Sequence, residues 1–120
     1  MNLLAIVTLT ALTLAGTHQE RQLPEHDELA KTGDVALDDW PMCDFFVVHT
    51  SRGFALVMWQ SGLWIFGEGD DVYGLADRVG RQTILLAGPI LSGQMTVDIE
   101  ATGVDLADAQ AAFYKRCKIP

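Results

Sequence analysis

Hydrophobic and polar residues alternate most regularly in residues 94–100 (QMTVDIE), where Met95, Val97 and Ile99 are separated by Thr and Asp. Successive side chains of a β-strand point to opposite faces, so this period of two predicts a strand with one buried and one solvated face. We therefore expect these three apolar side chains to lie in the core.

Three apolar runs earlier in the chain lack this alternation. Each run has strand length and directs apolar side chains to both faces. The runs are residues 45–50 (FFVVHT), 54–60 (FALVMWQ) and 63–66 (LWIF). Gly53 favours a turn between the first two runs, and residues 61–62 (SG) have the two-residue length of a tight hairpin. The pattern predicts a three-stranded antiparallel meander that is covered on both faces.

The rest of the chain predicts two shorter strands and a helix. Residues 72–75 (VYGL) and 83–87 (TILLA) have strand length and are bounded by turn-forming residues. Residues 105–116 (DLADAQAAFYKR) have helical spacing, with Asp105 placed to cap the N-terminus. The side chains expected on the docking face of this helix are Leu106, Ala109, Ala112, Phe113 and Cys117.

These elements predict a small all-β or α+β domain over residues 43–120. We expect five or six antiparallel strands, partly or fully closed, with one helix at the C-terminal end. An SH3-like or OB-like barrel is the nearest architecture, and a β-sandwich or an open α+β sheet are the alternatives. The likeness is one of architecture and carries no function.

Two cysteines lie at the ends of this expected domain. Cys43 comes directly before the first strand, and Cys117 lies on the apolar face of the helix. A disulfide between them would close a loop of about 75 residues and stabilise the domain by roughly 4 kcal/mol on the chain-entropy model. The alternative is a pair of buried free thiols in a cytosolic protein.

The N-terminal stretch indicates export. Residues 3–15 (LLAIVTLTALTLA) are uncharged and apolar, and Ala15 ends the run as a small residue would at a cleavage point. We expect a signal peptide within residues 1–16, although no Lys or Arg precedes the apolar run; an N-terminal strand is the alternative. The run is shorter than the roughly 20 residues that span a bilayer, so we expect no stable membrane insertion after cleavage. The predicted location is the periplasm or the extracellular space.

The segment between the leader and Cys43 is strongly acidic. Residues 17–39 contain seven acidic residues, two basic residues and no aromatic residue. Such a composition buries too little apolar surface to offset the entropy lost on ordering. We therefore predict a flexible acidic tail over residues 17–42.

Charge limits the partners. The formal net charge is −8, and no basic stripe is present that could bind phosphates. Nucleic acid and anionic lipid surfaces are therefore not expected as partners, whereas a basic protein, a cation or a neutral ligand is compatible with the charge.

Signals for catalysis and for metal binding are weak. His49 and Ser51 share one face of a predicted strand, but no glycine-rich elbow surrounds the serine. The acidic turn at residues 68–71 (EGDD) lacks the ligand spacing of an EF-hand. We expect no cofactor and no metal, and we keep a small-ligand or weakly hydrolytic site around His49 and Ser51 as the alternative function.

Aromatic residues cluster near the predicted hairpin. Trp59 and Trp64 would face one another across residues 61–62, with Phe66 nearby. Such a group either packs the domain or forms an exposed surface for a partner. We take Trp59, Trp64 and Phe66 as the candidate binding surface of an exported, non-enzymatic domain. Its expected partner is a protein or an envelope component, as for an inhibitor or an accessory subunit.

Overall fold

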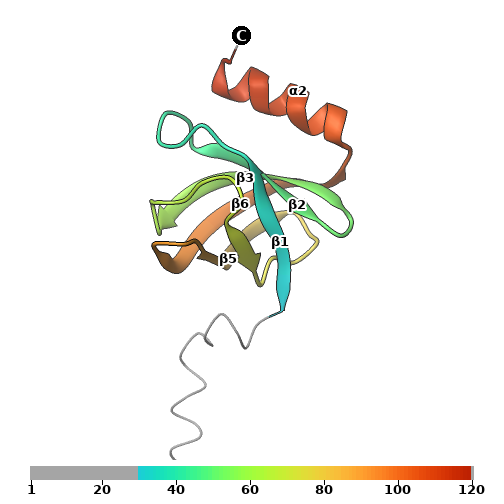
Figure 1. Cartoon of the computed structure of the whole chain (residues 1–120). Helices are drawn as coiled ribbons and strands as arrows, with labels where there is room; N and C mark the ends of the chain where they lie inside the picture. The colour runs from blue at the N-terminus through green and yellow to red at the C-terminus, as the bar shows by residue number, and fades with distance from the viewer. Residues whose placement is uncertain (1–29, 120) are drawn as a thin grey trace, which may run out of the picture.

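The computed structural model describes residues 30–119, in which six antiparallel strands close into a barrel and one helix packs against its outer surface (Figure 1). Around the barrel the strands follow the order β1-β2-β3-β6-β5-β4, and β4 pairs with β1 to close it. The predicted small antiparallel barrel with a C-terminal helix is thus confirmed. The elements are β1 Lys31–Leu37, β2 Phe45–Thr50, β3 Gly53–Gly62, β4 Asp71–Tyr73, β5 Gly80–Ala87, β6 Ser92–Val104 and α2 Leu106–Cys117.

The barrel interior is filled by aliphatic side chains and one phenylalanine. Met95, Val97 and Ile99 of β6 point inward and are buried, as their alternation predicts. β6 is longer than the predicted strand because it pairs with β3 on one side and with β5 on the other. The buried interior residues are Val35, Phe46, Val48, Ala55, Val57, Val72, Leu75, Ile84, Leu86, Met95, Val97 and Ile99.

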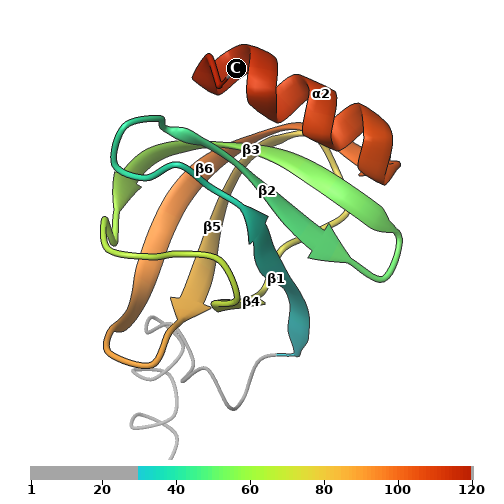
Figure 2. The same cartoon turned by 45° about the horizontal axis from the view of Figure 1, so that its top comes forward.

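A second core lies between the barrel and α2. Phe45 and Val47 of β2 point outward, where they pack with Ala109 and Phe113 of the helix. Figure 2 shows α2 lying over β2 and β3. The continuous apolar run of β2 is therefore explained, because one face fills the barrel and the other receives the helix.

The helix begins as predicted after Asp105, whose carboxylate accepts a hydrogen bond of 2.8 Å from the backbone N–H of Asp108. Its docking face is narrower than predicted. Leu106 was expected on that face but is half exposed, while burial is concentrated on Ala109 and Phe113, one turn apart.

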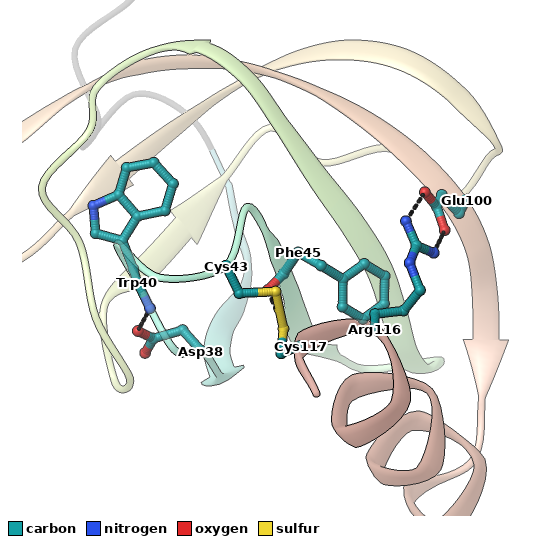
Figure 3. The surroundings of a disulfide bond; sticks show 7 residues. All are labelled: Asp38, Trp40, Cys43, Phe45, Glu100, Arg116 and Cys117. Atoms are coloured by element: carbon teal, nitrogen blue, oxygen red, sulfur yellow. Dashed lines mark hydrogen bonds and ion pairs between the residues drawn. A yellow bond between two sulfur atoms is a disulfide. The ribbon is translucent and has the colours of Figure 1, made fainter. Parts of the chain in front are cut away.

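The predicted disulfide is formed between Cys43 and Cys117, with an S–S distance of 2.05 Å and a Cα–Cα distance of 5.5 Å. It joins the segment before β2 to the last turn of α2 (Figure 3). Beside it, the Arg116 guanidinium lies 4.6 Å from the centre of the Phe45 ring and pairs with both carboxylate oxygens of Glu100 at 2.6 and 3.1 Å. These hydrogen bonds raise the pKa of Arg116. The C-terminal half of α2 is therefore attached by a covalent bond, a ring contact and an ion pair.

The prediction of a flexible acidic tail over residues 17–42 is wrong for residues 31–42. Residues 31–37 form β1, in which Val35 is buried and pairs with Val48 of β2. The segment has few apolar side chains, but β1 is also held by backbone hydrogen bonds to strands on both of its sides. The ordered domain thus starts before Cys43. The predicted signal peptide and residues 17–29 of the tail lie outside the described residues.

The prediction that residues 63–66 form the third strand of a meander is also wrong. The chain does not turn back at residues 61–62; β3 continues through Gly62, which pairs with Met95 of β6. Gly62 has a φ of +97°, and a Cβ added there would lie 2.6 Å from the carbonyl oxygen of Gln94. The backbone N–H of Leu63 then donates to that same oxygen at 2.7 Å. Pairing with a distant strand therefore prevails over the local hairpin signal, and residues 63–66 lie in a loop.

Candidate functional site

Two connections at one end of the barrel expose large hydrophobic side chains. Trp64 and Ile65, in the loop between β3 and β4, are 63% and 46% exposed. Ile90 and Leu91, in the turn between β5 and β6, are 89% and 41% exposed. We call these four residues the apolar rim. The two connections lie at the end of the barrel where β3 and β5 stop and β6 begins (Figure 2).

Between the two connections lies a groove of about 180 Å³, which we call the apolar groove. Its charged lining residue is Asp70, and the other lining residues are apolar or glycine. The residues that line it are Ile65, Phe66, Gly67, Asp70, Gly88, Pro89, Ile90 and Leu91.

Asp70 is fixed in this groove by both its backbone and its side chain. Its carbonyl oxygen accepts from the N–H of Val35 at 2.9 Å, which ties the loop to β1. One carboxylate oxygen accepts from the N–H of Gly67 at 2.9 Å. The carboxylate also lies close to Gly88, where an added Cβ would approach it to 2.9 Å. The groove thus has a positioned negative charge between its two walls.

Four aromatic rings in successive contact support the loop that carries Trp64. Phe66 lies 4.8 Å from Phe46 in the barrel core and 4.8 Å from Trp40, and Trp40 lies 5.2 Å from Trp59, all measured between ring centres. The indole N–H of Trp59 donates to the carbonyl oxygen of Leu63 at 2.9 Å. These contacts order the start of the loop and hold it against the core.

The structure therefore separates the three residues predicted as the binding surface. Trp59 and Phe66 are partly buried and pack against the interior, whereas Trp64 points into solvent. The Trp59–Trp64 pair across a hairpin is not formed, because Trp64 lies in the loop beyond β3. Trp59 instead packs on Trp40.

Sequence reasoning missed Trp40, Ile90 and Leu91. Trp40 falls within the predicted tail, residues 17–42, although a tryptophan is unusual in a segment too polar to fold. Ile90 and Leu91 follow Gly88-Pro89 in a turn, where two consecutive large aliphatic residues were an available signal of a binding surface.

The alternative site around His49 and Ser51 lies where β2 ends and turns into β3. His49 Nδ1 is 3.6 Å from the Asp34 carboxylate, and its ring lies 4.9 Å from Phe54. Because 3.6 Å exceeds hydrogen-bond length, Asp34 does not orient the imidazole as the acid of a catalytic triad does. Ser51 lies in the exposed turn and lines, together with Asp34 and His49, an open hollow of about 370 Å³.

A polar cleft of about 280 Å³ opens beside Ser51. Two cations line it, but both are paired with carboxylates: Lys31 with Asp71 at 2.9 Å, and Arg52 with Asp77 at 3.5 Å. The hydrogen bond to Asp71 raises the pKa of Lys31. The paired charges leave little net field in the cleft to attract an ionic ligand.

The two aspartates of the acidic turn at residues 68–71 have separate structural roles. Asp71 pairs with Lys31, and Asp70 accepts from Gly67. Over residues 30–119, no three His, Cys, Asp or Glu side chains come together in a way that could hold a metal ion.

Comparison with protein-family models, with curated proteins and with solved structures finds no match to this chain. In the part of the chain that the structure describes, no helix is long and apolar enough to cross a membrane.

Proposed function

We propose that this protein is an exported, non-enzymatic binding domain that holds a protein or an envelope component at the apolar rim. The observation that carries the proposal is that the exposed side chains of Ile65, Ile90 and Leu91 line the apolar groove, with exposed Trp64 next to Ile65 in the chain. Clusters of exposed hydrophobic residues beside a groove are typical of interaction sites, whereas scattered ones are not.

The rim contributes little to the cores of the domain. The aromatic rings that stabilise the loop are Trp40, Trp59 and Phe66, and these are partly buried. Trp64 and Ile90 instead expose most of their surface to water, at a cost that a partner would relieve by covering them. The rim is therefore the surface at which substitution separates binding from folding.

Trp64→Ala and Ile90→Ser are expected to reduce capture of the partner by at least about tenfold, because buried aromatic and aliphatic anchors dominate interface energies. The measurement uses the oxidised full chain as bait against the envelope fraction, with the captured species identified and quantified for each variant. Thermal unfolding of each variant shows whether the domain is still folded.

Two variants serve as matched controls for this experiment. Val79→Ser alters an exposed valine in the connection between β4 and β5, and His49→Ala alters the alternative site. Both are expected to capture the partner as the unmodified chain does. If His49→Ala abolishes function while the rim variants retain it, the site at His49 and Ser51 replaces the present proposal.

Export is supported by the Cys43–Cys117 disulfide, since structural disulfides persist in oxidising compartments and are rare in the cytosol. We expect the protein purified from its producing cell to have lost its N-terminal leader near Ala15 and to have a mass two hydrogens below that of its reduced form. N-terminal sequencing and intact mass spectrometry measure both. A mature N-terminus at Met1 with two free thiols would contradict export.

A further inference from the structure

We propose that the apolar groove receives a single apolar side chain of a polypeptide whose neighbouring residues are Lys or Arg. This inference rests on the proposed function and adds to it the chemistry of the partner. It follows from the size of the groove, from its charge and from the position of the apolar rim.

The size of the groove matches one side chain. Its volume is about 180 Å³. Small-molecule sites occupy about 300–1,000 Å³, whereas a cavity of about 150 Å³ accommodates benzene. A leucine, isoleucine or phenylalanine side chain therefore fits, while a cofactor-sized ligand does not. The walls formed by Ile65, Ile90 and Leu91 supply the apolar surface that such an anchor would bury.

The charge of the groove selects the residues beside that anchor. Asp70 lines the groove, and exposed Glu68 lies two positions before it. Neither connection contains a cation, as the sequences of residues 63–70 (LWIFGEGD) and 88–91 (GPIL) show. On β1, which pairs with β4, the basic residue is Lys31, and it is paired with Asp71 at 2.9 Å. A cationic partner gains an attractive contact here, and an acidic partner meets repulsion.

Asp70 is preorganised to make that contact. An ionised carboxylate has about four acceptor positions, and the N–H of Gly67 occupies one of them. The hydrogen bond and the packing against Gly88 hold the carboxylate between the two walls. A Lys or Arg next to the seated side chain would reach it without reorganisation of the loop. The chain's net charge of −8 would also speed encounter with a basic segment.

The test uses nuclear magnetic resonance of the ¹⁵N-labelled, oxidised full chain and four synthetic nonapeptides. GKKGLGKKG has the apolar anchor and the cations, GKKGAGKKG lacks the anchor, GSSGLGSSG lacks charge, and GEEGLGEEG reverses the charge. We expect GKKGLGKKG to shift the amide resonances of Gly67, Gly88 and Ile90, and to bind at least about tenfold more tightly than each of the other three.

Asp70→Asn is the decisive variant, because asparagine retains an oxygen for the Gly67 N–H while losing the charge. We expect it to weaken GKKGLGKKG binding several-fold and to leave GSSGLGSSG binding unchanged. Asp77→Asn removes a charge in the polar cleft instead and serves as the matched control. Raising the ionic strength from about 0.01 to 0.15 M shortens the Debye length from about 30 to 8 Å, and should weaken binding to the unmodified chain.

The outcomes separate this inference from the proposed function. Equal binding of the three leucine peptides, no effect of Asp70→Asn, or no shift at the groove with any peptide would overturn the inference. If capture of the partner still depends on Trp64 and Ile90 in such a case, the proposed function stands with a partner of different chemistry. Loss of that dependence would instead overturn the proposed function.

Discussion

Replacing both Cys43 and Cys117 with serine is expected to lower the free energy of unfolding by about 4 kcal/mol. The two residues are 74 positions apart, so the bond restricts nearly the whole domain in its unfolded state. Small domains have total stabilities of about 5–15 kcal/mol, so this loss is a large part of the margin. The melting temperature should fall by roughly 4–8 °C for each kcal/mol lost.

Urea unfolding of the full chain, followed by tryptophan fluorescence, measures this effect. The denaturant slope should also increase in the double serine variant, because its unfolded state is no longer held compact by the bond. Reduction of the unmodified chain under the same conditions is the matched comparison and should give the same loss within error. A loss below about 1 kcal/mol would mean that the bond does not constrain the unfolded chain as the entropy model requires.

Phe46→Ala is expected to destabilise the domain by about 3–5 kcal/mol, the range observed when a buried phenylalanine is truncated. The Phe46 side chain is 1% exposed inside the barrel and contacts the ring of Phe66 at 4.8 Å between centres. Removing it leaves a cavity in the barrel and deprives the loop between β3 and β4 of its deepest aromatic contact.

Phe46→Leu and Trp64→Ala are the comparison variants for this loss of stability. The leucine variant retains much of the buried volume and should be less destabilised than the alanine variant. Trp64→Ala removes a larger but mostly exposed ring and should change stability by no more than about 0.5 kcal/mol. If Trp64→Ala destabilised as much as Phe46→Ala, the rim would belong to the core, and the separation of binding from folding would be wrong.

Local signals in the sequence predicted the parts of the fold that local physics determines. The period of two at Met95, Val97 and Ile99 identified β6, and the capping position of Asp105 identified the start of α2. Cys117 was placed on the docking face by helical spacing alone, and this placed the disulfide correctly. Each of these inferences depends on residues that are close together in the chain or on one repeating period.

The parts that the sequence did not predict depend on distant partners. β1 has one fully buried side chain, Val35, and is ordered because β2 and β4 supply hydrogen bonds on both sides. Residues 61–62 have the signature of a hairpin but are paired with β6. Amino-acid composition and local turn propensity contain no information about pairing between distant strands. Neither the order of β1 nor the continuation of β3 through residues 61–62 could therefore be predicted from them.

The candidate site was predicted in part for the same reason. Aromatic content pointed to the loop that carries Trp64, and the structure places that side chain in solvent. The opposite wall of the groove, formed by Ile90 and Leu91, lies about 25 positions further along the chain and is brought near by the pairing of β6 with β3 and of β5 with β4. The β3–β6 pairing, between strands that are not consecutive in the chain, makes these two connections neighbours.

Closure of the barrel also restricts how a partner can recognise this protein. Each of the six strands that the structure describes has a neighbour on both sides, although β4 covers only Leu85–Ala87 of β5. The pairing leaves less open sheet edge than a flat sheet would, which disfavours strand addition by a peptide and edge-to-edge aggregation in the folded state. A partner that binds at the apolar rim, as we propose, would therefore be recognised mainly through side chains of the connections between strands rather than through the backbone of a sheet edge.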